Sequence, residues 1–287
     1  MRIIQTIKEL QNTLNQQRQS AGSVALVPTM GNLHQGHLQL VSTAQRHADI
    51  VVVSLFVNPT QFGANEDLDS YPRTMQDDID KLEALNTDIL FAPTIDEMYP
   101  LGGDHTSRVH VPGITDVLCG ASRPGHFDGV TTIVNKLFNI SRAEFAIFGE
   151  KDFQQVAVIR RMVDDLNIPI TIITEPTVRE ADGLALSSRN GYLSKAQRQL
   201  APQLYATLLE VKLAITAGDN NFEQLEINAK ERLTAQGFKP DYLHIFQRDF
   251  LQPAKDTDTD LIILVAAFAG TTRLIDNLSV NLTTHTL

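Results

Sequence analysis

The sequence predicts an α/β protein: a Rossmann-like parallel sheet with helices on both faces, followed by a small α+β C-terminal domain. Short β-branched runs alternate with helical patterns over residues 1–175, and these apolar runs end in polar turns. After Pro176, two long helical stretches precede a group of strand-like runs. We therefore expect one domain at residues 1–176 and a second at residues 177–287.

The expected elements follow the apolar runs in order. Strands of the first domain are expected at Val24–Val27, Ile50–Val57, Asp88–Phe91, Phe145–Phe148 and Ile170–Thr174. Helices are expected near Leu38–Arg46, Met75–Leu85, Gly129–Ile140 and Phe153–Leu166. The second domain is expected to hold helices at Ser194–Ala217 and Phe222–Gln236, and strands at Tyr242–Phe246, Leu261–Ala267 and Arg273–Val280. No dinucleotide fingerprint and no Walker A sequence follows any strand, so phosphate would have to be bound by another device.

The composition is that of a globular chain. Its 287 residues, 43% of them hydrophobic, are enough for two domains. The net charge of −10 argues against a broad DNA- or RNA-binding surface, which needs clustered Lys and Arg. The single cysteine, Cys119, allows no internal disulfide. No apolar run is long enough to span a membrane and the N-terminus is too polar for a signal peptide, so we expect a cytoplasmic protein that binds neither nucleic acid nor membrane.

The run His34-Gln-Gly36-His37 lies where an expected strand is followed by an expected helix. Backbone N–H groups in a first helical turn lack partners and the helix dipole is positive there, so an anion is stabilised. Histidines three residues apart share a helix face, and Gly36 has no Cβ to obstruct a phosphate. The alternatives are a metal pair or two capping histidines. A metal would need at least a third ligand, and Cys119 alone provides no cluster.

Asn58 and Gln61 follow the apolar run VVVSLFV. Ligands of open α/β sheets bind at the carboxyl ends of the strands, so this segment and the His34 segment are expected to face one cleft. Neutral amides can orient a carboxylate or hydroxyls without an ion pair that would weaken the carboxylate as a nucleophile. The alternative is a polar turn stabilised by Pro59.

Asp77 and Asp78 come at the start of an expected helix, with Thr74 as its candidate N-cap. The helix dipole favours acidic residues in a first turn, which would be explanation enough. The alternative is a Mg²⁺ site, because Mg²⁺ in nucleotide sites takes one or two carboxylates together with phosphate oxygens and water.

Two further segments carry groups suited to phosphate. Lys151 opens an expected helix, where a lysine opposes the dipole and therefore favours a functional interpretation, and Gln155 lies one turn later. Ser187, Ser188 and Arg189 lie near the domain junction, where two hydroxyls and a guanidinium can grip a triphosphate. In isolation the Ser-Ser-Arg run would be interpreted as a loop.

Six motifs together resemble one family. In order they read PTMGNLHQGH, FVNPTQF, YPRT with the two aspartates, GHFDGV, FGEKDFQQ and PTVREADGLALSSRN. From about Val24 to Tyr192 the chain is similar to the pantothenate synthetases, also called pantoate–β-alanine ligases, of the wider HxGH nucleotidyltransferase group. The resemblance continues weakly to the C-terminal LIDN.

The resemblance implies a two-step reaction with Mg²⁺. ATP and (R)-pantoate give an enzyme-bound pantoyl adenylate and pyrophosphate, and the amine of β-alanine then attacks the acyl carbon to give pantothenate and AMP. The implied partners are these small molecules and a second copy of the chain in a homodimer.

The resemblance also implies roles for site residues. His34 and His37 would contact the phosphates as catalytic groups, and the triphosphate would be gripped by Lys151, Ser187, Ser188 and Arg189. The nucleotide site would be lined by Met30, Gly36, Phe148, Gly149, Val178 and, near the ribose, Asp152. Pantoate would be held by Gln61, Gln155 and Asn58, and Mg²⁺ by Asp77.

The chemistry of the residues supports the same assignment independently of the resemblance. In-line attack on the α-phosphorus needs positioning and charge neutralisation more than a protein nucleophile. The adenylate must be kept from water, and the small C-terminal domain is expected to act as a lid. The rival hypotheses are a nucleotidyltransferase acting on a phosphate ester, a metal-dependent hydrolase with His34 and His37 as ligands, and a nucleotide-binding regulatory protein without activity.

Overall fold

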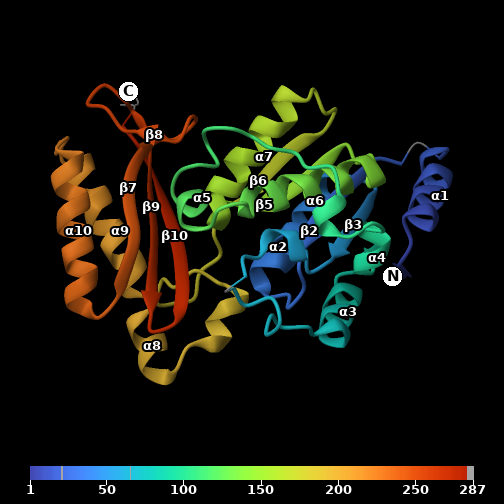
Figure 1. Cartoon of the computed structure of the whole chain (residues 1–287), viewed down its shortest axis with the longest axis horizontal. Coiled ribbons are helices and arrows are strands. Elements are labelled where there is room, and N and C mark those ends of the chain that lie inside the picture. The colour runs from blue at the N-terminus through green and yellow to red at the C-terminus, as the bar shows by residue number, and fades with distance from the viewer. Residues whose placement is uncertain (21, 65, 283–287) are drawn as a thin grey trace. The chain divides into compact units, whose positions relative to one another are not determined.

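The structure is a computed structural model that describes residues 1–20, 22–64 and 66–282, and these form two compact units (Figure 1). The first unit contains Met1–Glu150 and Val158–Pro176. The second contains Lys151–Ala157 and the described residues from Thr177 to Leu282. A division at Pro176 alone would leave Lys151–Ala157 in the first domain, whereas this segment packs with the second unit.

The first unit is built on a six-stranded sheet in which every neighbouring pair is parallel. Its strand order is β1-β4-β3-β2-β5-β6. The strands are β1 (Arg2–Ile4), β2 (Val24–Thr29), β3 (Ile50–Leu55), β4 (Ile89–Phe91), β5 (Phe145–Gly149) and β6 (Thr171–Glu175). The sequence pattern did not predict β1, which is only three residues long and pairs with β4 at one edge.

Helices cover both faces of this sheet, as predicted. On one face α2 (Gln35–His47) and α3 (Met75–Ala84) bury apolar side chains against alternate residues of β2 and β3. The intervening residues of β2, such as Leu26, are equally buried. α6 (His126–Ser141) packs against β2, and α1 (Ile7–Arg18) packs against α6.

The helix α7 (Phe153–Asp165) contributes to both units. The shorter elements are α4 (Ile95–Met98), α5 (Cys119–Ser122), η1 (Pro59–Gln61), η2 (Gly103–His105) and η3 (Glu150–Asp152).

The sheet has a topological switch point between β2 and β5. From β2 the chain passes to β3 and β4 on one side, and β5 and β6 lie on the other. In open α/β sheets the crevice at the carboxyl ends of such strands is the usual ligand site. The segments that begin at Met30, Asn58 and Glu150 follow β2, β3 and β5 and therefore emerge at this edge.

The second unit is the predicted small α+β domain. Its antiparallel sheet has the order β10-β9-β7-β8, made of β7 (Lys239–Gln247), β8 (Gln252–Pro253), β9 (Asp260–Ala269) and β10 (Thr272–Asn281). One face packs against α9 (Gln203–Thr216) and α10 (Phe222–Gln236), and η4 (Ser188–Tyr192) and α8 (Lys195–Leu200) precede them. The prediction of a single helix at Ser194–Ala217 is wrong. Because Pro202 has no N–H to donate within a helix, the chain forms two helices, α8 before it and α9 after it. Among the described residues no helix is long and apolar enough to cross a membrane.

Candidate functional site

The histidine motif forms the N-terminus of α2. The helix begins at Gln35, three residues before the expected start, and His34 is its N-cap with an extended backbone (φ −124°, ψ 175°). His34 Nδ1 accepts a hydrogen bond from Gly36 N at 3.1 Å, and His37 Nδ1 accepts one from His34 N at 3.3 Å. The two imidazoles thus form a capping box, with ring centroids 4.1 Å apart.

These contacts determine which ring nitrogen carries the proton. A backbone N–H can only donate, so Nδ1 of His34 and of His37 is unprotonated, and each neutral ring carries its hydrogen on Nε2. The capping alternative is therefore observed, and it is compatible with phosphate binding because the Nε2–H groups are donors. The described part of the chain contains no group of three or more His, Cys, Asp or Glu side chains arranged to hold a metal ion.

Asp78 holds the turn that leads into His34, a role that the sequence interpretation missed. Its side chain is fully buried. Asp78 Oδ2 accepts from Asn32 N at 2.9 Å, and Asp78 Oδ1 accepts from Leu33 N at 2.7 Å. Gly31 in the same turn has φ +84°, and a Cβ there would lie 3.2 Å from Asp78 Oδ2.

The signal for Asp78 was present in the sequence. It lies four residues before Leu82, which is also fully buried, so both side chains lie on the core-facing side of α3. Thr74 precedes α3, but its hydroxyl donates to Asp78 Oδ2 at 3.1 Å instead of capping the helix. Asp77, the predicted Mg²⁺ ligand, is exposed in the first turn. Because Asp78 is committed to backbone N–H groups, Asp77 is the member of the pair able to offer a carboxylate to a ligand.

The hydrogen-bond partners of Asn58 fix the orientation of its side-chain amide, that is, which end carries the nitrogen and which the oxygen. The carbonyl oxygen of Gly129 can only accept, so its 3.1 Å contact identifies Asn58 Nδ2 as a donor. Asn58 Oδ1 accepts from the hydroxyls of Tyr99 at 2.8 Å and Thr60 at 3.0 Å. Asn58 Nδ2 also donates to Gln61 Oε1 at 3.0 Å. Two donors and two acceptors are the full capacity of an asparagine amide, and Asn58 uses all of them on protein groups.

The Asn58 amide in turn orients the amide of Gln61. Since Gln61 Oε1 accepts from Asn58, its Nε2 is the end that faces Met30, with Met30 Sδ at 3.2 Å. A thioether is a weak acceptor, so a ligand oxygen can replace it. Met30 follows β2 and Gln61 follows β3, and the structure therefore brings together two residues predicted for the site.

The backbone of Gln61 is held as firmly as its side chain. Gln61 O accepts from His126 Nδ1 at 2.8 Å, and Arg123 Nη1 donates to His126 Nε2 at 3.0 Å. Arg123 also forms two hydrogen bonds to Glu66, at 2.6 and 2.5 Å. Burial of Glu66 raises its pKa, but the hydrogen bonds and charge of Arg123 outweigh this and hold the pKa below its ordinary value. Sequence reasoning gave Arg123 and Glu66 no role.

Gly129 allows α6 to approach η1. A Cβ at Gly129 would lie 2.4 Å from Thr60 O and 2.6 Å from Gln61 Cα. Only glycine fits at this contact, and the carbonyl of the same residue sets the orientation of the Asn58 amide.

The end of β5 offers an open approach to the backbone. Phe148 is buried, and a Cβ built on Gly149 would meet no atom within 4 Å. Gly149 is the last residue of β5, next to β2 in the sheet. The space in front of Gly149 is therefore compatible with the predicted nucleotide contact.

The remaining predicted residues belong to the second unit. Lys151 and Asp152 lie in η3, with Lys151 Nζ 4.0 Å from Asp152 Oδ2, and Gln155 is half-buried in α7. The Lys151 side chain is 18% exposed. This contact is long and weak, so a nucleotide phosphate could displace it from the ammonium group.

Val178 and the Ser-Ser-Arg run are joined by a hairpin. Val178 O accepts from Leu186 N at 3.0 Å, which brings the chain back beside itself before Ser187. Ser187 is the N-cap of η4 and its Oγ accepts from Arg189 N at 3.2 Å. Ser187, Ser188 and Arg189 are all half-buried.

The predicted residues therefore form two sets, one in each unit. The first unit carries Met30, His34, Gly36, His37, Asn58, Gln61, Asp77, Phe148 and Gly149. The second carries Lys151, Asp152, Gln155, Val178, Ser187, Ser188 and Arg189.

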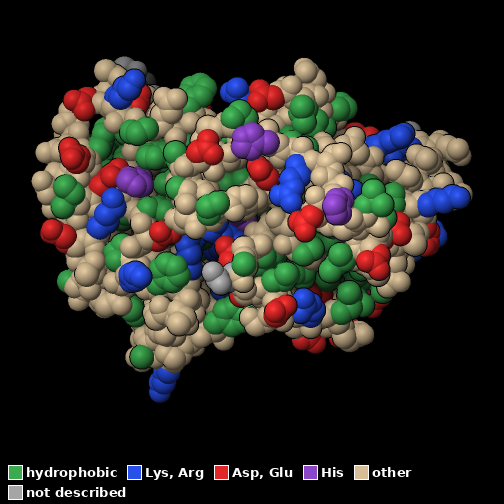
Figure 2. Space-filling view, viewed as in Figure 1, with side chains coloured by type: hydrophobic (Ala, Val, Ile, Leu, Met, Phe, Trp, Pro, Cys, Tyr) green, Lys and Arg blue, Asp and Glu red, His purple; other side chains and the backbone are tan. Residues whose placement is uncertain are grey.

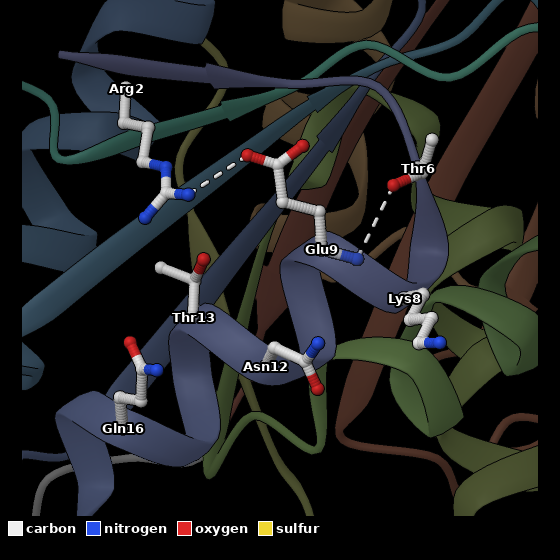
Figure 3. A pocket seen from close by; sticks show the side chains of 7 residues that line it. All are labelled: Arg2, Thr6, Lys8, Glu9, Asn12, Thr13 and Gln16. Atoms are coloured by element: carbon white, nitrogen blue, oxygen red, sulfur yellow. Dashed lines mark hydrogen bonds and ion pairs between the residues drawn. The ribbon is translucent and has the colours of Figure 1, made fainter.

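The surface adds little to this assignment. On the face shown in Figure 2, basic side chains are scattered among acidic ones. Figure 3 shows an open hollow beside α1, lined by Arg2, Thr6, Lys8, Glu9, Asn12, Thr13 and Gln16. Its walls hold an Arg2–Glu9 ion pair of 2.9 Å and none of the predicted site residues.

Fold and site together define a Rossmann-like α/β protein in which a helix capped by two histidines begins at the switch point of the sheet. The family model described as pantoate-beta-alanine ligase matches residues 2–279. The chain belongs to this family of ligases, which confirms the resemblance of the six motifs.

Individual relatives agree over the whole length. The chain is 54% identical over 284 residues to the pantothenate synthetase of Pseudomonas fluorescens strain Pf0-1, covering 99% of both sequences. A solved pantothenate synthetase of Thermus thermophilus has a TM-score of 0.91 at 45% identity, covering 97% of this chain and 99% of that one. The pantoate-beta-alanine ligase of Francisella tularensis, solved in complex with Beta-gamma ATP and Beta-alanine, has a TM-score of 0.81 at 36% identity and covers 97% of each chain.

Proposed function

We propose that the protein condenses (R)-pantoate with β-alanine in an ATP-dependent reaction that passes through a pantoyl adenylate and releases pyrophosphate and AMP. Family membership supports the condensation, and the nucleotide in the F. tularensis complex supports ATP as the second substrate. The observation that carries the proposal is the capping box of His34 and His37, which places two Nε2–H donors at the N-terminus of α2.

In the first step the carboxylate of pantoate attacks the α-phosphorus and pyrophosphate leaves. Charge develops on the phosphoryl oxygens, and preformed donors stabilise it without reorganisation. His34 and His37 supply such donors together with the helix N-terminus. Lys151 and Arg189 neutralise the charge of the triphosphate and of the pyrophosphate that leaves, and the hydroxyls of Ser187 and Ser188 donate hydrogen bonds to its oxygens. The rest of the nucleotide lies against Met30, Gly36, Phe148, Gly149, Asp152 and Val178.

Pantoate is held by amides. Gln61 donates from Nε2 to an oxygen of pantoate, replacing its contact with Met30 Sδ, and Gln155 supplies a second amide. Asn58 acts through Gln61, since its own hydrogen-bonding groups are used on protein partners. Neutral partners leave the carboxylate nucleophilic, whereas an arginine would lower its reactivity.

Mg²⁺ is assigned to Asp77. An exposed carboxylate beside the turn that Asp78 orders fits an ion that takes most of its ligands from phosphate and water. When bound, the ion would neutralise charge on the phosphate oxygens.

The test is product analysis by mass spectrometry with ATP, Mg²⁺, pantoate and β-alanine, omitting each in turn. The proposal requires pantothenate and AMP in equal amounts, and only in the full mixture. ADP and inorganic phosphate in place of AMP and pyrophosphate would mean an acyl phosphate and would overturn the proposed adenylate.

A further inference from the structure

Two adjacent residues of β10, Asp276 and Asn277, are polar and nearly fully buried, with exposed fractions of 4% and 7%. They are paired with β9 in an unbroken antiparallel register, opposite Val265 and Leu264. Successive side chains of a strand point to opposite faces of the sheet. Each of the two residues therefore reaches a different segment of the second unit.

Asp276 holds the hairpin that leads into the Ser-Ser-Arg run. Arg179 donates from Nη1 to Asp276 Oδ2 at 2.6 Å and from Nη2 to Asp276 Oδ1 at 2.8 Å. The Arg179 guanidinium also donates to Gly183 O at 3.1 Å, and its carbon lies 3.7 Å from the ring centroid of Tyr205. A buried bidentate pair is geometrically restrictive, so the hairpin has a defined position on β10.

Asn277 holds the segment that carries the lysine. Its Nδ2 donates to Lys151 O at 2.9 Å, across 126 residues of sequence. This is a bond to the backbone of Lys151 and leaves the ammonium group uninvolved. The cation–π contact of Arg248 with Phe153, 5.6 Å from carbon to ring centroid, adds a second attachment of the same segment to this unit.

We propose that Asp276 and Asn277 are positioning residues that set the spacing between Lys151 and Ser187–Arg189. The strand β10 then holds both groups of triphosphate-binding residues, Lys151 and Ser187–Arg189, in a fixed arrangement. The inference rests on the proposed ATP-dependent function, and it explains why Lys151–Ala157 packs with the C-terminal unit although the chain on both sides belongs to the first. Both residues act through other protein residues, Asp276 through Arg179 and Asn277 through the backbone of Lys151.

Asn277 gives the cleaner test, because removing Asp276 would leave the Arg179 charge without its partner and destabilise the unit. ATP binding is measured by calorimetry for the wild type, Asn277→Ala, Asn277→Asp and the control Ser279→Ala, which lies on the same face of β10. We expect the dissociation constant for ATP to rise about tenfold in Asn277→Ala, the effect of one lost hydrogen bond, and at least as much in Asn277→Asp, which cannot donate to Lys151 O. Ser279→Ala is expected to match the wild type.

A double-mutant cycle separates positioning from general stability. If Asn277 acts through Lys151, Asn277→Ala costs less than about twofold in ATP affinity once Lys151 is already alanine. The KM for β-alanine stays unchanged in every Asn277 variant. Should Asn277→Ala fail to fold, as its melting temperature would reveal, the isosteric Asn277→Asp provides the same comparison.

The outcomes are distinct. Wild-type ATP affinity in both Asn277 variants, or equal losses with and without the Lys151 side chain, would overturn the positioning role while leaving the proposed reaction intact. A wild-type protein that neither binds ATP nor forms AMP would overturn the proposed function itself.

Discussion

Asn58 donates a hydrogen bond to Gln61 Oε1 at 3.0 Å, and this bond makes Gln61 present its NH₂ group to the site. The orientation originates at Gly129, whose carbonyl oxygen can only accept and lies 71 residues from Asn58 in the chain. A donor amide suits the oxygens of a hydroxy acid. The same amide turned by half a revolution would present an acceptor and repel a carboxylate.

Gln61→Glu tests this orientation. The new carboxylate keeps the bond from Asn58 but presents a negative charge to pantoate, so kcat/KM for pantoate should fall at least a hundredfold, about 3 kcal/mol, as for like charges placed together. A protonated glutamic acid can donate again, so the ratio of mutant to wild-type kcat/KM should rise as the pH falls toward 5. Gln16→Glu adds the same charge on the exposed face of α1 and serves as the control. A kcat/KM for pantoate equal to that of the wild type would contradict the assignment.

Mutation should distinguish the structural role of Asp78 from the proposed Mg²⁺-binding role of Asp77. Asp78→Asn replaces an acceptor that holds Asn32 N or Leu33 N by a donor, which costs about 2 kcal/mol of the free energy of unfolding and loosens the turn before His34. Asp77→Asn should leave the melting temperature unchanged and raise the Mg²⁺ concentration needed for half-maximal rate. Thermal melts and Mg²⁺ titrations of both variants check this. The reverse pattern would exchange their roles.

Nδ1 of His37 accepts the hydrogen bond of the cap, Nε2 is proposed to donate to phosphate, and two substitutions can separate these roles. Asn in place of His37 keeps an acceptor near the Nδ1 position and removes the Nε2–H donor, whereas Gln reaches the Nε2 position and loses the cap. We expect His37→Asn to retain most of its stability and lose at least about a hundredfold in adenylate formation. His37→Gln should keep more activity and lose about 1 kcal/mol of stability. Equal activity in both variants would mean that Nε2 does not donate in the reaction.

The Glu66–Arg123 pair predicts a specific loss of stability in acid. The pKa of Glu66 in the folded protein lies below its ordinary value, so the pair contributes stability above the unfolded-state pKa of about 4.3. That contribution is lost as the pH falls through the lower, folded-state pKa. Glu66→Gln should therefore lower the free energy of unfolding by about 1 kcal/mol at pH 7 and by progressively less below pH 4. Chemical denaturation from pH 3 to 7 measures the difference, and a difference that grows in acid would refute the coupling.

The sequence predicted what depends on local pattern. Strands β2, β3 and β5 are apolar runs that end in polar turns, and the histidines begin a helix because a capping box needs only four consecutive residues. β1 was not predicted because a strand of three residues is too short to show an alternating hydrophobic pattern. Its position depends on pairing with β4.

The parts that sequence could not predict depend on tertiary contacts. The spacing of Asp78 from Leu82 indicates that Asp78 faces the core, but it does not reveal that the backbone N–H groups of Asn32 and Leu33 are its partners. The carbonyl oxygen of Gly129 fixes the orientation of the Asn58 amide, and the position of Lys151 depends on its hydrogen bond with Asn277. Such roles require knowing which distant backbone atoms a side chain meets.

The most direct test of the central claim is exchange of labelled pyrophosphate into ATP without β-alanine. A reversible adenylate step predicts that label enters ATP with the wild-type protein only when pantoate and Mg²⁺ are present, and that Lys151→Ala lowers the rate by two or more orders of magnitude. Exchange without pantoate, or pantothenate formation with no exchange at all, would contradict it.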